Sequence, residues 1–230
     1  MRQQEHKAPK RKKRWKKALL VFLILMLGLF LGLYIWQYEN CNALIKVWTT
    51  DSEIIVKEME TKRDEHHQAI EQDNGMEISV KPVTTQQSED LLDGKATATQ
   101  VKEEMGVLDG QTPASNKEDI INQCVSALYA YKVDVMAYLG GLKQEALNQW
   151  NALAPGQRTK TKKAEIAMDG LHKCYSYEAQ VDGHVEALLG EYREKMRQIG
   201  EDTKPIDDLW YYYCDEKEAE KAYYFDKYLN

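Results

Sequence analysis

The side chains of this 230-residue sequence that could do chemistry include four cysteines, five histidines and thirty-seven acidic residues. Nucleophilic catalysis needs an activated Ser or Cys, yet the sequence contains neither a G-x-S-x-G nor an S-x-x-K signature. The cysteines of the helical region fall on apolar helix faces, where a thiol is inert rather than activated. The sequence therefore predicts no nucleophilic centre.

Metal and phosphate sites are not indicated either. His66 and His67 are adjacent, so on a helix they point about 100° apart and cannot share a metal as an i, i+4 pair would. Residues 172–174 (HKC) and 182–184 (DGH) are also poorly spaced for zinc, and no phosphate-binding glycine loop occurs. We expect these histidines at surface or boundary positions, and we expect neither a metal nor a cofactor.

Paired carboxylates are abundant but have an ordinary explanation. Asp207 and Asp208 fall in the first turn of an expected helix, where the helix dipole favours acids. Glu218 and Lys221 are three residues apart, as on a solvated helix face. No catalytic residue is predicted, and we expect the protein not to be an enzyme.

Tyrosines form the remaining candidate site. Eight of residues 208–230 are aromatic. Placing three antiparallel helices side by side predicts a shared layer made by Tyr131, Tyr138, Tyr177, Tyr224 and Tyr228. Packing is the favoured interpretation, because tyrosine supplies bulk while its hydroxyl stays wet. A platform for a ligand or glycan is the alternative.

The elements that must position this layer are helices. Apolar residues recur with a 3.6-residue period over about 117–153 and again over about 160–199, and Pro205 opens a third helix. The first stripe comprises Ile121, Cys124, Val125, Leu128, Tyr131, Val135, Tyr138, Leu139, Leu142, Ala146, Trp150 and Leu153. Short connections predict an antiparallel three-helix bundle over 117–230.

The same alignment of the three helices predicts which cysteines lie at the same level along the bundle axis. With hairpins near residues 156 and 202, Cys124 and Cys214 lie within about 3 Å of each other along the bundle axis. A disulfide between Cys124 and Cys214 is thus possible, whereas Cys174 lies about 21 Å from the level of Cys124. The alternative is that buried cysteines serve as small apolar residues. Cys41 is a weaker candidate for a bond between two chains.

Residues 39–116 are less regular. We expect residues 39–75 to form a juxtamembrane helical stalk, which is interrupted at TTDSE. Residues 76–116 predict a small mixed subdomain and linker, with a short strand or extended segment at 76–82 and two short helices ending at Gly94 and Gly106.

The N-terminal region predicts a membrane anchor. Residues 1–17 carry nine Lys or Arg against one Glu, and the nineteen residues 18–36 carry no charge. They span roughly 28 Å, which matches a bilayer core, and aromatic residues extend the anchor to 38. A cleaved signal peptide would have a shorter apolar run and small residues at a cleavage site. We therefore expect an uncleaved signal anchor, with a cytoplasmic N-terminus and an extracytoplasmic C-terminus.

Charge and spacing in this region also suggest partners. The basic residues 10–17 would contact anionic lipid on the cytoplasmic leaflet. Gly28 and Gly32 form a GxxxG pattern that could pair two anchors in a homodimer. Because the net charge is −6 and the basic residues cluster at the N-terminus, the main body is acidic, which argues against nucleic-acid binding.

Several segments resemble a known group of sequences. They are LLDGKATATQ, NQCVSALYAYKVDVMAYLGGL, ALAPGQRTK, KAEIAMDGLHKCYSYEAQVDGHVEALLGEYREKMRQIGEDT and EKEAEKAYYFDKYL. Over about residues 76–230 the chain is similar to uncharacterised single-pass membrane proteins of Gram-positive anaerobic bacteria, which have a C-terminal helical domain. The resemblance implies no activity and no site residue.

The sequence as a whole predicts a mainly all-α, single-pass membrane protein. We expect a helical scaffold or assembly protein that contacts other membrane or surface proteins. The alternative is an extracytoplasmic sensor or binding module that recognises a small ligand or cell-wall fragment through its tyrosine layer.

Overall fold

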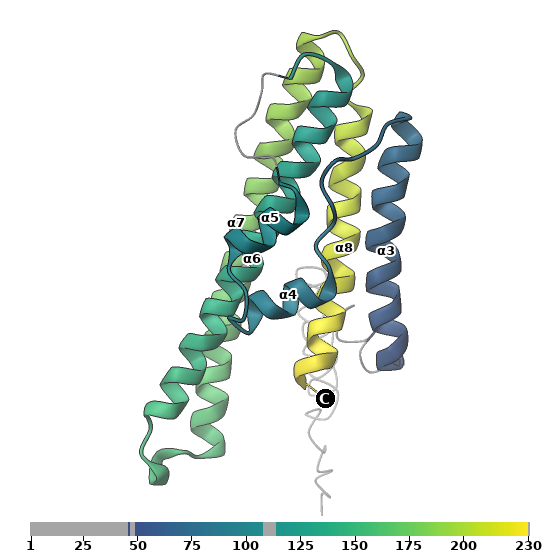
Figure 1. Ribbon diagram of the computed structural model, residues 1–230. Coiled ribbons are helices and arrows are strands. Elements are labelled where there is room, and N and C mark those ends of the chain that lie inside the picture. Colours follow the sequence, from purple (N-terminus) through teal and green to yellow (C-terminus); the bar gives the residue numbers. More distant parts are fainter. Residues whose placement is uncertain (1–45, 47–48, 108–113, 230) are drawn as a thin grey trace, which may run out of the picture. The chain divides into compact units, whose positions relative to one another are not determined.

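The computed structural model describes residues 46, 49–107 and 114–229 (Figure 1). Within these residues the protein is all-α, which confirms the all-α part of the predicted fold class. The helices are α3 (Ser52–Asn74), α4 (Thr85–Leu92), α5 (Ala98–Met105), α6 (Lys117–Ala152), α7 (Lys160–Gln198) and α8 (Lys204–Leu229), with a 3₁₀ turn, η1 (Pro155–Gln157), between α6 and α7.

The chain divides into two compact units. One is Val56–Lys217, and the other combines Met1–Ile55 with Glu218–Asn230. The packing of α3 after Ile55, of α4 to α7, and of α8 up to Lys217 belongs to the first unit.

The long helices begin and end where their sequences dictate. The Asn116 side chain accepts a hydrogen bond from the Asp119 N–H and caps α6, and Thr159 caps α7 in the same way. Pro155 stands just after α6, where it cannot continue the helix. Gly200 follows α7 with φ of +76°, a backbone conformation that favours glycine.

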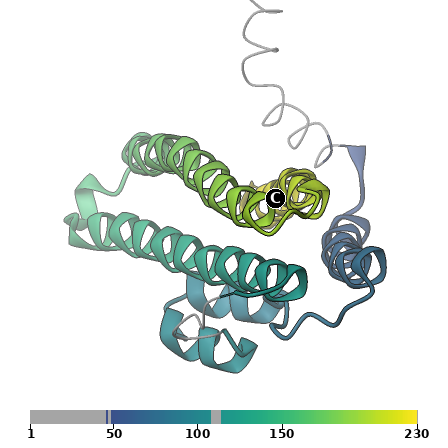
Figure 2. The same cartoon turned by 90° about the horizontal axis from the view of Figure 1, so that it is seen from above.

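Helix α6 lies between α7 on one side and the short helices α4 and α5 on the other (Figure 2). Thr84 and Thr97 cap α4 and α5 through capping boxes with Gln87 and Gln100. Helix α4 approaches α6 closely at Gly140, because a Cβ there would lie 2.5 Å from the Leu91 carbonyl oxygen. Two opposite faces of α6 are therefore covered.

Of the two alternatives predicted for residues 76–82, a short strand or an extended segment, the structure shows the extended segment. It forms no strand within the described residues. Its backbone is bonded instead by the Asn122 and Glu71 side chains and by the Met105 carbonyl. Buried and exposed side chains still alternate along the segment, as Ile78 and Val80 are buried. The mixed character predicted for 76–116 is thus replaced by two helices and extended connections.

No helix within the described residues is both long enough and apolar enough to span a bilayer. The predicted anchor at 18–38, with Gly28 and Gly32, lies outside the described residues, as do the basic tail and Cys41.

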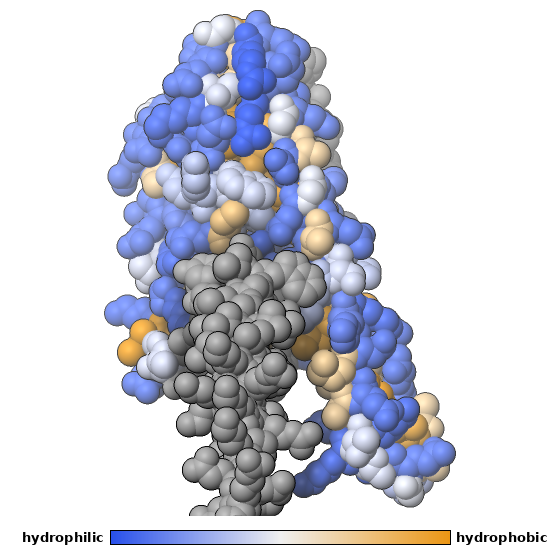
Figure 3. Space-filling model, turned by 180° about the vertical axis from the view of Figure 1, so that it is seen from behind, coloured by the Kyte–Doolittle hydropathy of each residue, from blue (hydrophilic) through white to orange (hydrophobic). Residues whose placement is uncertain are grey.

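The α6–α7 hairpin continues beyond the helices that cover it. We call residues 141–180 the arm, because none of these forty residues is buried, whereas the residues that flank it, Gly140 and Val181, are buried. Leu147 on α6 is 43% exposed and Met168 on α7 is 52% exposed. In Figure 3 apolar surface is interspersed with polar surface toward the free end of the arm, at the lower right. The arm is a two-helix projection without a core of its own.

Candidate functional site

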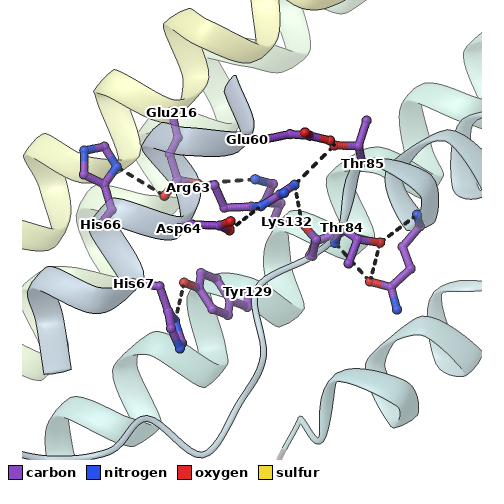
Figure 4. A network of polar contacts seen from close by, with 12 residues as sticks. Glu60, Arg63, Asp64, His66, His67, Thr84, Thr85, Tyr129, Lys132 and Glu216 are labelled. Atoms are coloured by element: carbon purple, nitrogen blue, oxygen red, sulfur yellow. Dashed lines mark hydrogen bonds and ion pairs between the residues drawn. The ribbon is translucent and has the colours of Figure 1, made fainter. Parts of the chain in front are cut away.

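A group of charged side chains lies where α3, α6 and α8 meet. We call it the clasp, and its members are Lys62, His66, Lys132, Asp215 and Glu216. The Lys62 Nζ lies 2.5 Å from Oδ1 of Asp215, and the Lys132 Nζ lies 3.4 Å from Oε2 of Glu216. His66 stands between the two carboxylates, with Nε2 3.3 Å from Oδ2 of Asp215. Its Nδ1 lies 3.4 Å from Oε1 of Glu216, and this contact is drawn in Figure 4.

The electrostatics of the clasp centre on Glu216, whose side chain is only 15% exposed. Burial opposes ionisation of this carboxyl, but the Lys132 ammonium and the His66 ring outweigh burial. The pKa of Glu216 therefore lies below its ordinary value. The His66 ring also stacks on Tyr212, with centroids 4.5 Å apart and an interplanar angle of 17°. The contact from His66 Nδ1 is electrostatic, since it is not aligned as a hydrogen bond.

Neighbouring contacts tie α3 to the segment before α4 and to α6 (Figure 4). The Arg63 Nη1 donates to the Val83 carbonyl oxygen at 3.0 Å, and the Thr85 hydroxyl donates to Oε1 of Glu60 at 2.9 Å. His67 Nδ1 lies 3.1 Å from the Tyr129 hydroxyl. Burial raises the pKa of Tyr129 well above its usual range, so this hydroxyl stays protonated.

A second ionic contact joins α7 to α8. The Lys217 Nζ lies 3.0 Å from Oδ1 of Asp182 and 3.4 Å from Oε1 of Glu178. The Tyr213 hydroxyl donates to the same Asp182 carboxylate. Burial and this carboxylate raise the pKa of Tyr213 far above its ordinary value. Opposite charges are matched here as in the clasp, so both groups hold helices together.

The predicted tyrosine layer is assembled in part. The Tyr138 and Tyr177 rings have centroids 3.9 Å apart, and Tyr131 stacks on His184 at 4.1 Å. Burial raises the pKa of both Tyr131 and Tyr177. Tyr224 and Tyr228 belong to the part of α8 in the other compact unit, where Tyr224 packs edge-to-face with Tyr223.

A shallow depression adjoins this layer. Its volume is about 240 Å³, and it is lined by Tyr138, His172, Lys173, Ser176, Tyr177 and Gln180. Tyr138 is 46% exposed beside it. Lys173 is neutralised by Glu145 and Asp169, at 2.8 and 3.1 Å. The depression offers an aromatic wall and polar groups without an uncompensated charge.

The cysteines Cys124, Cys174 and Cys214 are thiols in the structure, so no bond joins Cys124 to Cys214. That pairing stays a prediction for the oxidised protein. Cys124 is fully buried, and burial raises the pKa of its thiol far above the ordinary value. It packs as a small apolar residue in the described structure.

We expect Cys124 to react with N-ethylmaleimide at least about a hundredfold more slowly than half-buried Cys174, since labelling of Cys124 requires unfolding. Peptide mass spectrometry of the native full chain measures both rates, and guanidinium should make them equal. Equal rates in the native protein would contradict the burial argument. Failure to label Cys124 and Cys214 in guanidinium until a reductant is added would instead establish the predicted disulfide.

The sequence predicts His66 and His67 at surface or boundary positions, but it does not predict the clasp. The signal in the sequence is slight: Lys62 and His66 are four residues apart, and Asp215 and Glu216 are adjacent. Among the described residues, no cluster of His, Cys, Asp and Glu side chains could hold a metal ion. No known family model, no curated protein and no solved structure matches the chain.

Proposed function

We propose that the protein is a membrane-anchored, extracytoplasmic helical scaffold that acts through protein–protein contacts. In this proposal residues 1–17 are cytoplasmic, 18–38 span the membrane, 39–75 form a stalk, 76–116 a small subdomain, and 117–230 an antiparallel three-helix bundle. The charge asymmetry around the apolar stretch supports this topology.

The observation that carries the scaffold proposal is the arm. A helical pair usually buries its apolar stripe against further elements, because a two-helix layer cannot enclose a core. Leu147 and Met168 remain exposed toward the free end of the arm, whereas the ion pairs Lys143–Asp93 and Glu178–Lys217, which join the arm to other described helices, lie at its base. The clasp supports the same role, since matched ion pairs fix α3 and α8 to the body from which the arm projects.

Photocrosslinking tests the proposal directly. Benzoylphenylalanine is introduced at exposed Ala164 on the arm and, as a matched control, at exposed Glu103 on α5. In native membranes the full chain should give discrete protein adducts at position 164 and few at position 103. The same adduct pattern at both positions, or no protein adduct at 164, would refute a scaffold acting through its arm.

The orientation has its own test. Trypsin added to intact spheroplasts should cleave within the α6–α7 connection, where Arg158 and Lys160 are exposed. Cleavage that occurs only after lysis would place the C-terminal region in the cytoplasm and contradict the proposed topology.

The tyrosine-lined depression favours a second candidate, a sensor or binding module. The tilted pair of Tyr138 and Tyr177 rings beside polar groups suits a saccharide ring of a cell-wall fragment. Muropeptides should then raise the melting temperature of the full chain, and Tyr138→Ala should abolish the rise. Unchanged melting at millimolar muropeptide would remove this candidate.

A further inference from the structure

The free end of the arm differs in charge from the rest of the molecule. Residues 146–164 contain Arg158, Lys160, Lys162 and Lys163 but no Asp or Glu. Residues 18–230 as a whole carry 22 Lys or Arg against 36 Asp or Glu, the totals of 31 and 37 less the nine and one in residues 1–17. A basic tip therefore stands at the end of a projection from an acidic chain.

Internal contacts use only part of this charge. The Arg158 guanidinium donates to the carbonyl oxygens of Asn151 and Leu153 and so caps α6, and Lys162 pairs with Glu165 at 2.7 Å. Lys160 and Lys163 are exposed and have no ion pair within the described residues. The positive field at the tip is thus open to an outside partner.

The position of these lysines is unfavourable for the isolated helix. Lys160, Lys162 and Lys163 lie in the first turn of α7, which has no acidic residue to match the positive end of the helix dipole. Such an arrangement lowers helix stability unless an external anion compensates it.

Apolar side chains occupy the same end of the arm. Trp150 in the last turn of α6 and Leu153 directly after this helix are partly exposed, and Leu147 and Met168, farther from the tip, are more exposed. A soluble polyanion needs only the lysines. A bilayer surface also takes up tryptophan and leucine at the level of its headgroups, so the combination favours an anionic bilayer.

We propose that the tip of the arm, residues 146–164, docks on the surface of a bilayer that contains anionic lipid. The lysines bind the headgroup phosphates, and Trp150 and Leu153 enter the interfacial region. The arm then gives the scaffold a second membrane contact besides its N-terminal anchor. The inference rests on the proposed function only for the presence of that anchor.

Vesicle capture tests the docking. The full chain is reconstituted in immobilised phosphatidylcholine vesicles, and free fluorescent vesicles with or without about 30% phosphatidylglycerol are added. The wild type should capture the anionic vesicles, and about 0.5 M salt should release them. The variant K160Q/K162Q/K163Q should bind about thirtyfold more weakly, because it removes the two lysines that lack an ion pair within the described residues, each worth about 1 kcal/mol, together with Lys162.

The matched control is K57Q/K81Q/K117Q, which removes the same charge from lysines outside the arm. It should capture as the wild type does, and circular dichroism should show equal helix content in both variants. Equal weakening by both triple variants would overturn the proposal, as would equal capture of zwitterionic vesicles. Equally tight capture of polyphosphate-coated beads would overturn it in favour of a polyanion site.

These results are independent of the scaffold test, because vesicle capture uses lipid alone while crosslinking at Ala164 reports protein partners. A negative result for membrane docking therefore does not contradict the scaffold proposal, and the reverse also holds.

Discussion

Gly140→Ala is expected to lower the free energy of unfolding by about 2–3 kcal/mol, the usual cost of overpacking. The new Cβ would lie 2.5 Å from the Leu91 carbonyl oxygen and 3.1 Å from the Leu92 Cα. Both atoms belong to the backbone of α4, so no side-chain rotation relieves the clash and α4 must move off α6. Thermal unfolding of the full chain in detergent, followed by circular dichroism, should show a melting temperature lower by about 5–10 °C.

The adjacent glycine is the control. A Cβ at Gly141 meets no atom within 4 Å, so Gly141→Ala should add helix propensity alone and stabilise the protein by up to about 1 kcal/mol. The two substitutions are chemically identical and one residue apart, yet their effects should have opposite signs. Equal effects would mean that α4 does not pack on α6 at this point.

This close contact marks the limit of what periodicity predicts. The bounds of α4 to α8 follow from capping residues, glycines and prolines, and the sequence predicts them within a few residues. A single apolar stripe was predicted for α6, but the buried side chains include Tyr129, Val133 and Met136, which lie off that stripe. They pack because α6 has a second covered face, and a period of 3.6 does not say how many neighbours a helix has.

The arm and the clasp were missed for different reasons. Leu142, Ala146, Trp150 and Leu153 continue the stripe of α6, so the pattern predicts that they are buried, yet none of the four is buried in the structure. The clasp joins Lys62 to Asp215, which are 153 residues apart. Ion pairs between residues so far apart depend on which helices pack together, and a single sequence does not show this packing.

The clasp makes Glu216→Gln the second substitution with a large expected effect. The exchange keeps the shape of the side chain but removes the negative charge that Lys132 and His66 face. Removing one partner of a buried ion pair costs about 3–5 kcal/mol, and we expect about 2–3 kcal/mol because the site retains some solvent. Chemical denaturation of the full chain in detergent at pH 7 measures this loss.

Low pH should abolish the difference in the free energy of unfolding between the wild type and Glu216→Gln. Because the folded pKa of Glu216 is lowered, its ionised form stabilises the protein above the unfolded pKa, near the ordinary value of 4.5. That stabilisation is lost as the pH falls through the lower folded value. The stability gap between wild type and Glu216→Gln should therefore be constant from pH 7 to about 5 and shrink toward pH 3.

Two controls decide whether the clasp is the cause. Glu186→Gln removes a carboxylate from an exposed position on α7 and should change stability by less than about 0.5 kcal/mol at every pH. In a double-mutant cycle, Lys132→Met and Glu216→Gln should be coupled by about 1 kcal/mol or more, because their charged groups lie 3.4 Å apart. Additive effects would show that Glu216 acts without Lys132, and a gap that persists at pH 3 would show that its charge is not what stabilises α8.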